Sequence, residues 1–245
     1  MSSDLPINKP EWDEQNSQEF IDLADCIVPE RKLQTEIICS LVSARQHPFI
    51  ILDICCGEGL LAEALLNRFK KAIVIGLDGS ETMLKYAQER LSGYGDRFRV
   101  KKFDLRADDW RDPSTPMDAV VSSLALHHLT GYQKQKFYQD MFRLLSNGGE
   151  ILIADLIAPP GAEAVQLAAR LWDDIVRQRA KETGKQSVWE VFKNDHWNTY
   201  TFPDEMDKPS GLFEQLKWLD DSGFSEIDVY WMKAGHVVFG GRKRR

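Results

Sequence analysis

The stretch ILDICCGEG at residues 51–59 decides the fold, because it places a glycine-containing turn directly after an apolar run. The run belongs to FIILDI (49–54), and a segment with helical periodicity follows the turn. Gly57 and Gly59 have no Cβ, so the turn can bend sharply and bring backbone N–H groups close to a ligand at the helix N-terminus. We therefore predict a strand, a ligand-binding turn and a helix in that order.

Four more apolar runs bounded by turn residues repeat this unit, at residues 72–78, 98–104, 117–124 and 149–157. Segments with helical periodicity lie between them, and the third ends at the breaker NGG (147–149). Strands that alternate with helices pair in parallel through right-handed crossovers. The sequence therefore predicts an open α/β sheet covered on both faces.

The remaining segments surround this repeat, and together they form a single expected domain. Residues 1–47 are expected to form an N-terminal cap of two short helices separated at Pro29, ahead of a core at 48–157. Residues 158–210 break the alternation and are expected to form a helical lid. The final part, 211–245, holds a helix and two strand candidates separated by only two residues, so these strands should form a hairpin whose last strand is antiparallel to its partner.

The composition argues against several classes of protein. A net charge of -7 disfavours a surface matched to nucleic acid. No stretch approaches the roughly 20 apolar residues that span a bilayer, and MSSDLPINKPEWDEQ (1–15) lacks the regions of a secretion signal. The four cysteines give no ordered disulfide framework. We expect a cytoplasmic monomer or homodimer with reduced thiols and no membrane association, and a nucleic-acid partner is disfavoured.

Three carboxylates fall at the expected strand ends, namely Asp53, Asp78 and Asp104. Ligands of open α/β sheets bind in the crevice at these ends, and ionised carboxylates are seldom buried without partners. Asp78 can accept both hydroxyls of a ribose, and Asp104 can accept from the exocyclic amine of an adenine. Met83 and Leu105 would hold the base between apolar faces. These residues together indicate an adenosine site.

An adenosine site fits two classes of cofactor. GEGLLA (57–62) satisfies the dinucleotide pattern G-x-G-x-x-A, which is compatible with a nicotinamide dehydrogenase. Asp53, however, lies four residues before the first glycine, where its charge repels a diphosphate but suits an ammonium and a sulfonium. We therefore favour a methionine-derived sulfonium cofactor over NAD.

Five motifs in order, ILDICCGEG, VIGLDGSETML, FDL, AVVSSLALHHL and LLSNGGEILIADL, cover about residues 50–157. They resemble the motifs of class I S-adenosylmethionine-dependent methyltransferases of the small-molecule type. The resemblance implies a Rossmann-like sheet of seven strands, ordered 3-2-1-4-5-7-6, with strand 7 antiparallel. It also implies that Asp53 and the glycine turn hold the methionine end, and that the backbone of Ser122 and Ser123 meets its ammonium.

Three more residues complete the expected cofactor site. Cys55 occupies the first glycine position of the family's loop, so a small side chain lies where the backbone approaches the cofactor, and we still expect binding. Gly79 follows Asp78 within the second motif. Arg31, in the N-terminal cap, could pair with the methionine carboxylate.

Methyl transfer is an in-line displacement, so the protein must align the acceptor and often remove its proton. His127 is the better placed of two adjacent histidines to reach an acceptor, whereas His128 is expected to order the turn. His196 is an alternative general base, and Tyr200 lies near it in the lid. Three lid tryptophans, Trp172, Trp189 and Trp197, are expected to cover a planar or apolar acceptor.

No metal site is expected. Cys55 and Cys56 have no second cysteine or histidine pair at ligand spacing, and consecutive histidines at 127 and 128 should point in different directions. The expected function is methyl transfer from S-adenosylmethionine to O, N or C of a small organic acceptor. RNA methylation, a non-catalytic cofactor-binding subunit and a nicotinamide oxidoreductase remain the alternatives.

Overall fold

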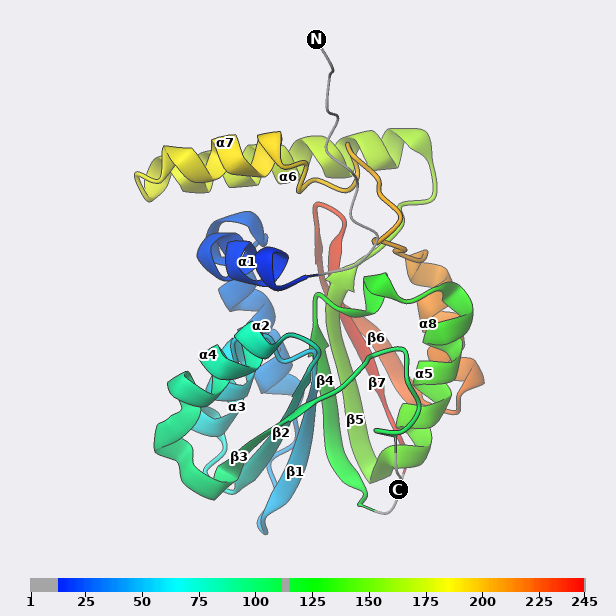
Figure 1. Ribbon diagram of the computed structural model, residues 1–245. Coiled ribbons are helices and arrows are strands. Elements are labelled where there is room, and N and C mark those ends of the chain that lie inside the picture. Colours follow the sequence, from blue (N-terminus) through cyan, green and yellow to red (C-terminus); the bar gives the residue numbers. More distant parts are fainter. Residues whose placement is uncertain (1–12, 112–114, 245) are drawn as a thin grey trace.

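A seven-stranded mixed sheet forms the centre of the protein, as seen in a computed structural model that describes residues 13–111 and 115–244 (Figure 1). Its strands are β1 (Phe49–Ile54), β2 (Ala72–Asp78), β3 (Phe98–Lys102), β4 (Met117–Ser123), β5 (Leu145–Leu156), β6 (Ser225–Lys233) and β7 (His236–Arg242). The order is β3-β2-β1-β4-β5-β7-β6, and β7 runs antiparallel to both neighbours. The predicted sheet and its closing hairpin are confirmed.

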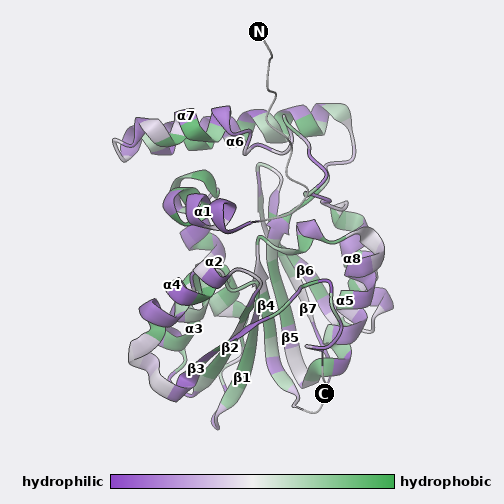
Figure 2. Ribbon diagram, viewed as in Figure 1, coloured by the Kyte–Doolittle hydropathy of each residue, from purple (hydrophilic) through white to green (hydrophobic). Residues whose placement is uncertain are grey.

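Helices cover both faces of the sheet, and Figure 1 shows α2, α3 and α4 on one side and α5 and α8 on the other. The helices are α1 (Glu14–Ile27), α2 (Arg31–Leu41), α3 (Leu60–Arg68), α4 (Glu81–Leu91), α5 (Gly131–Leu144), α6 (Ala162–Glu182), α7 (Gln186–Asn194) and α8 (Leu212–Asp221), with short 3-10 turns at Ser92–Arg97 and Leu126–His128. Figure 2 shows that the central strands are mostly hydrophobic, because both faces of each strand are covered.

The fifth strand begins earlier than its sequence indicates. We predicted a strand at 149–157 after the breaker NGG, but β5 already starts at Leu145, which pairs with Met117. The register shifts before the next pair, Ala119 with Glu150, so the extra residues of β5 form an irregularity within the strand. A Cβ on Gly149 would come within 2.9 Å of the Asp118 carbonyl oxygen, so this irregularity requires a glycine.

The N-terminal cap and the lid form one layer across the carboxyl ends of the parallel strands. Helices α6 and α7 lie over α1 (Figure 1), and a buried apolar cluster joins the three. Trp172 on α6 donates its indole N–H to the Ile27 carbonyl at the end of α1, 2.6 Å away. Within residues 13–111 and 115–244, no helix combines the length and the apolar character needed to cross a membrane.

Candidate functional site

The turn after β1 is built from backbone that favours glycine. Cys55, Gly57 and Gly59 have φ values of 52°, 54° and 84°, all in the left-handed region. A Cβ on Gly59 would also lie 2.9 Å from Leu91 Cδ1 and 3.3 Å from Ala87 Cβ, so a larger residue there would crowd α4. The sharp turn expected from the sequence is present, and Cys55 adopts a conformation that costs a non-glycine residue about 1–2 kcal/mol.

Asp78 ends β2 and fastens this turn. Its carboxylate accepts hydrogen bonds from the backbone amides of Gly57 (2.8 Å) and Ser80 (2.9 Å). Burial raises the pKa of Asp78 above its usual range, although these amides oppose the shift. Asp78 therefore presents a fixed carboxylate at the strand end, where the sequence predicts a ribose.

Asp53 is a buried carboxyl group of the site with an oxygen that no described residue satisfies. Its side chain is 1% exposed, and its Oδ2 has no hydrogen-bond partner among the residues that the structure describes. Burial, followed by the nearby charge of Asp78, raises the pKa of Asp53 to about 8. An orphaned buried acceptor is costly unless a ligand satisfies it. A cationic group such as the ammonium of a methionine-like ligand fits this requirement.

Of the other residues expected to bind the cofactor, some lie beside the turn after β1 and others lie in the loop after β3. Met83 is buried in the first turn of α4, and its Sδ lies 3.8 Å from where a Cβ on Gly57 would be. A Cβ on Gly79 would lie 3.3 Å from the Phe103 carbonyl oxygen, which places Gly79 next to the segment after β3. The third strand ends at Lys102, two residues before the predicted end, so Asp104 lies in the following loop.

This loop holds the other two residues that are expected to contact the adenine. The Asp104 carboxylate is exposed and accepts from the Arg106 amide at 2.8 Å. Leu105 is half-buried and packs against the core. Contacts of Asp104 and Leu105 with a base stay predictions.

Arg31 lies over the cofactor turn and is already paired. Its guanidinium is 3.3 Å from the carboxylate of Glu58, the residue between the two turn glycines, and 3.2 Å from Asp25. Arg90 reaches Glu58 from α4 at 2.8 Å. The cap helix thus contacts the turn through Arg31, as a cofactor role would need, while a methionine carboxylate would have to compete with Glu58.

The end of β4 supplies backbone next to Asp53, because Val121 pairs with Asp53 in the sheet. Ser122 donates its hydroxyl to the Ile54 carbonyl at 2.9 Å, which ties β4 to β1 at the crevice. Ser123 is half-buried, and Leu124 has a φ of 55°, so the chain turns sharply after the strand. The roles expected for Ser122 and Ser123 stay predictions.

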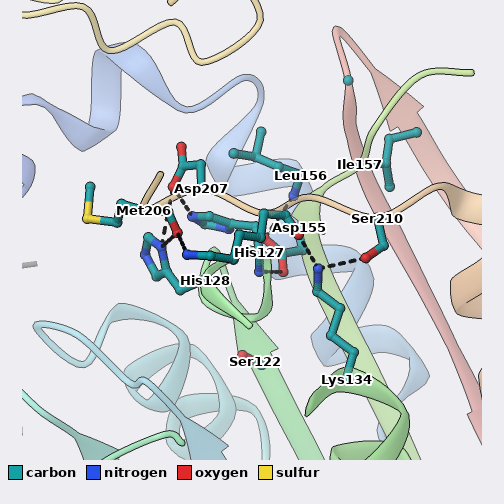
Figure 3. Close-up of polar contacts among 12 residues, drawn as sticks. Ser122, His127, His128, Lys134, Asp155, Leu156, Ile157, Met206, Asp207 and Ser210 are labelled. Atoms are coloured by element: carbon teal, nitrogen blue, oxygen red, sulfur yellow. Dashed lines mark hydrogen bonds and ion pairs between the residues drawn. The ribbon is translucent and has the colours of Figure 1, made fainter. Parts of the chain in front are cut away.

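His127 lies in the 3-10 turn after β4, with a carboxylate beside each ring nitrogen (Figure 3). Its Nδ1 is 2.5 Å from Asp155 Oδ1, and its Nε2 is 3.5 Å from Asp207 Oδ1. Burial lowers the pKa of His127, but the two carboxylates outweigh burial and hold it above its usual value. His127 is also only 6% exposed, so the expectation that it reaches an acceptor as a free base does not fit this geometry.

His128 converges on the same carboxylate as its neighbour. Its Nδ1 lies 3.3 Å from Asp207 Oδ1, and the rings of His127 and His128 are 4.1 Å apart. The expectation that consecutive histidines diverge is therefore wrong, because it holds for a strand and these residues form a 3-10 turn. Burial lowers the pKa of His128, whereas the two histidines lower that of Asp207 to about 2 against the effect of its own burial.

A buried lysine holds the segment that carries Asp207. Lys134 on α5 is fully buried and donates to Ser210 Oγ at 2.9 Å, as Figure 3 shows. It also donates to the Lys208 carbonyl at 2.5 Å. The Lys208 amide in turn donates to the His127 carbonyl at 2.6 Å. Sequence reasoning missed Lys134, Asp155 and Asp207; only Asp155 has a local signal, as a charged residue inside the apolar run of β5.

The other expected catalytic residues do not join this cluster. His196 is exposed, and its ring stacks on Phe202 at 4.0 Å. The Tyr200 hydroxyl lies 2.8 Å from the Ile157 carbonyl and 2.7 Å from that of Gly235, and burial raises its pKa far above the usual value. These contacts favour a structural role for Tyr200, which fastens the lid to the final hairpin.

The lid tryptophans likewise serve mainly in packing. Trp172 is 5% exposed and contacts the rings of Phe192 and His236. Trp189 stacks on Phe192, and Trp197 lies near Phe20 of α1. The expected aromatic lining is therefore wrong for Trp172, because its ring fills the interior of the lid layer.

The sequence of this chain resembles those of known methyltransferases. Residues 51–149 match the family described as a methyltransferase domain. An uncharacterized methyltransferase of Geobacillus kaustophilus is 35% identical over 43% of this chain and 46% of that protein. The carboxy-S-adenosyl-L-methionine synthase of Nautilia profundicola is 23% identical over 96% of this chain and 97% of its own length. The chain spans about half the length of the first curated relatives it matches.

A solved structure agrees with these matches at the level of the fold. Phosphoethanolamine N-methyltransferase 2 of Haemonchus contortus, in complex with phosphomonomethylethanolamine and S-adenosylhomocysteine, aligns with a TM-score of 0.66 and 16% identity, over 98% of this chain and 62% of that one. The sheet order and the glycine turn at Asp53 agree with the domain match. Residues 51–149 match a methyltransferase domain, and the matches together support assignment of the chain to the class I S-adenosylmethionine-dependent methyltransferases.

Proposed function

We propose that this chain transfers a methyl group from S-adenosylmethionine to O, N or C of a small organic acceptor. The observation that carries the proposal is the buried Asp53 carboxyl, which keeps an oxygen without a partner among the described residues and lies near Asp78. A diphosphate would add negative charge to this place, whereas a methionine-derived ligand brings a cation. The same observation disfavours NAD.

Different residues of the crevice would bind different parts of the cofactor. Asp53 would take the ammonium, Asp78 the ribose hydroxyls, and Met83 one face of the adenine. The bound cofactor supplies an electrophilic methyl on a sulfonium. The chain's own part is to align the acceptor with that methyl and to exclude water, for which the layer of α1, α6 and α7 is suited because it covers the strand ends.

The acceptor side is more polar than the sequence suggested. His128 and Asp207 keep 20% and 15% of their side chains exposed beside β4, while Trp172 is used in packing. We therefore favour a polar acceptor that can hydrogen-bond, in place of the planar or apolar one expected from the tryptophans. An RNA acceptor would need a basic face, and the net charge of -7 disfavours one.

Calorimetry with S-adenosylmethionine and with NAD tests the cofactor. We expect binding of the sulfonium and none of NAD; the opposite result would overturn the proposal. A panel of small acceptors, assayed for release of S-adenosylhomocysteine, then tests turnover. Cofactor binding with no release across a broad panel would favour a non-catalytic subunit.

A further inference from the structure

We propose that His127, His128 and Asp207 form a binding site for a divalent transition metal ion, with zinc as the matching class. Each residue offers one ligand atom, and the three atoms lie within 4.8 Å of one another. They come from two segments far apart in the sequence, the 3-10 turn after β4 and the segment before α8, which meet at the crevice (Figure 3). Two imidazoles and a carboxylate are a ligand set that proteins use for zinc.

Two of the three distances between the ligand atoms fit tetrahedral coordination, and the third, between the two histidine nitrogens, is within 4.8 Å. Asp207 Oδ1 lies 3.5 Å from His127 Nε2 and 3.3 Å from His128 Nδ1. Tetrahedral ligands at about 2.0–2.1 Å from zinc are about 3.3–3.4 Å apart. Octahedral ligands at the same bond length would be about 2.8–3.0 Å apart. The two Asp207 distances therefore match the tetrahedral set.

Asp155, which is not one of the three proposed ligands, orients His127. Asp155 is 1% exposed and engages His127 twice, at Nδ1 (2.5 Å) and at the backbone amide (2.9 Å). A carboxylate on one ring nitrogen fixes the tautomer and directs the other nitrogen to a metal, as in many zinc sites. Here that other nitrogen is Nε2, the atom next to Asp207.

The second segment is also held in place, so the site does not depend on a free loop. The Lys208 amide donates to the His127 carbonyl at 2.6 Å, and the buried Lys134 ammonium binds the Lys208 carbonyl. Asp207 is thereby fixed next to both histidines from the backbone side. Preorganised ligands lower the cost of binding a metal.

Three protein ligands leave one tetrahedral position open, which is the arrangement of catalytic zinc sites. The side chains of His128 and Asp207 are partly exposed, so a small molecule can approach that position. An oxygen or nitrogen of the acceptor could bind there, and the metal would lower its pKa. This role rests on the proposed function, whereas metal binding itself does not.

The competing account is an ion pair alone, in which a protonated His127 lies between two carboxylates. Titration of the chelator-treated full chain with zinc chloride, by calorimetry in the absence of cofactor and acceptor, separates the two accounts. We expect one equivalent to bind, and at least tenfold weaker binding in Asp207→Asn and in His128→Gln. Matched controls are Glu205→Gln, an exposed carboxylate of the same segment, and His47→Ala, an exposed histidine elsewhere.

Cobalt(II) gives a second measurement, because a tetrahedral site absorbs visible light strongly and an octahedral one weakly. We expect strong bands that Asp207→Asn abolishes and Glu205→Gln leaves unchanged. Absence of one-equivalent binding, weak octahedral-type bands, or equal affinity in the two site variants and the controls would overturn the proposal. Thermal unfolding checks each variant, and if one fails to fold, the other site variant and the wild-type spectrum decide.

Discussion

At the ends of β1 and β2, Asp78 is held by backbone amides, and Asp53 keeps a buried oxygen without a partner among the described residues. Near the ends of β4 and β5, Asp155 of β5 and Asp207 of the segment before α8 are both engaged by histidines. The β1–β2 half keeps a buried carboxyl oxygen unsatisfied by the described residues, and the β4–β5 half pairs its carboxylates with histidines. The difference indicates that the β1–β2 half needs a ligand to satisfy its carboxyl oxygen, whereas the two carboxylates of the β4–β5 half already have partners within the chain.

The two halves also differ in how the chain builds them. The β1–β2 half depends on a short turn and on residues next to two neighbouring strands. The β4–β5 half depends on contacts across the sequence, such as those of Lys134 with the segment at 208–210. A substitution at Asp78 should therefore mainly affect cofactor binding, and one at Lys134 should mainly affect folding stability.

The largest effect is expected at Lys134. Lys134→Ala removes a fully buried side chain and leaves the Lys208 carbonyl and the Ser210 hydroxyl without their donor, so it should cost about 2–5 kcal/mol of the free energy of unfolding. Lys136→Ala, on the same helix, removes only surface ion pairs and should cost less than about 1 kcal/mol. Urea-induced unfolding measures both. Equal costs would contradict the anchoring role of Lys134.

A somewhat smaller effect is expected on cofactor affinity. Asp78→Ala should weaken binding of S-adenosylmethionine by at least about tenfold, because hydrogen bonds to a charged acceptor contribute about 1.5–3 kcal/mol. Asp109→Ala, an exposed carboxylate in the loop after β3, should bind normally. Calorimetry of folded variants provides the comparison, and unchanged affinity in Asp78→Ala would remove this residue from the site.

The smallest effect is expected at the two cysteines, where the direction of the change is informative. Cys55 has a φ of 52°, so Cys55→Gly should relieve backbone strain and stabilise the chain by up to about 1 kcal/mol. The Cys56 side chain is buried and its backbone is not in the left-handed region, so Cys56→Gly should destabilise the chain. Thermal unfolding of both variants gives the two signs. A loss of stability in Cys55→Gly as large as that in Cys56→Gly would contradict the argument from strain.

The sequence predicted the sheet because its signals are local. Apolar runs, the turn at Gly57 and Gly59, and the two-residue connection at Ala234 and Gly235 each specify their own backbone. The strand-end position of Asp53 followed from the same pattern. Errors in the fold were confined to boundaries, such as the early start of β5, where the register shifts within the strand.

The β4–β5 half was poorly predicted for a physical reason. Asp207 lies in a segment without periodicity, and only the folded chain brings it to His127 and His128. Trp172 was assigned to an acceptor lining because its burial depends on contact with α1, which no local pattern reveals. The adjacent histidines were expected to point in different directions, whereas their 3-10 turn makes them converge.

The proton balance of cofactor binding tests the central claim most directly. Burial raises the pKa of Asp53 to about 8, compared with about 3.9 when unfolded, so its ionisation destabilises the free fold as pH rises from about 4 to 8. A bound cation favours the carboxylate. Binding of S-adenosylmethionine should therefore release a proton and tighten by up to about tenfold per unit between about pH 6 and 7.5, below the titration of the ligand's own amine.

Calorimetry in two buffers of different ionisation enthalpy, with Asp53→Asn as the control, measures this release. The wild type should release a proton on binding and bind more tightly as pH rises. Asp53→Asn should bind more weakly and without the pH dependence. Proton release and pH dependence that are the same in both proteins would contradict the account of Asp53 as the carboxyl group that selects a cationic cofactor.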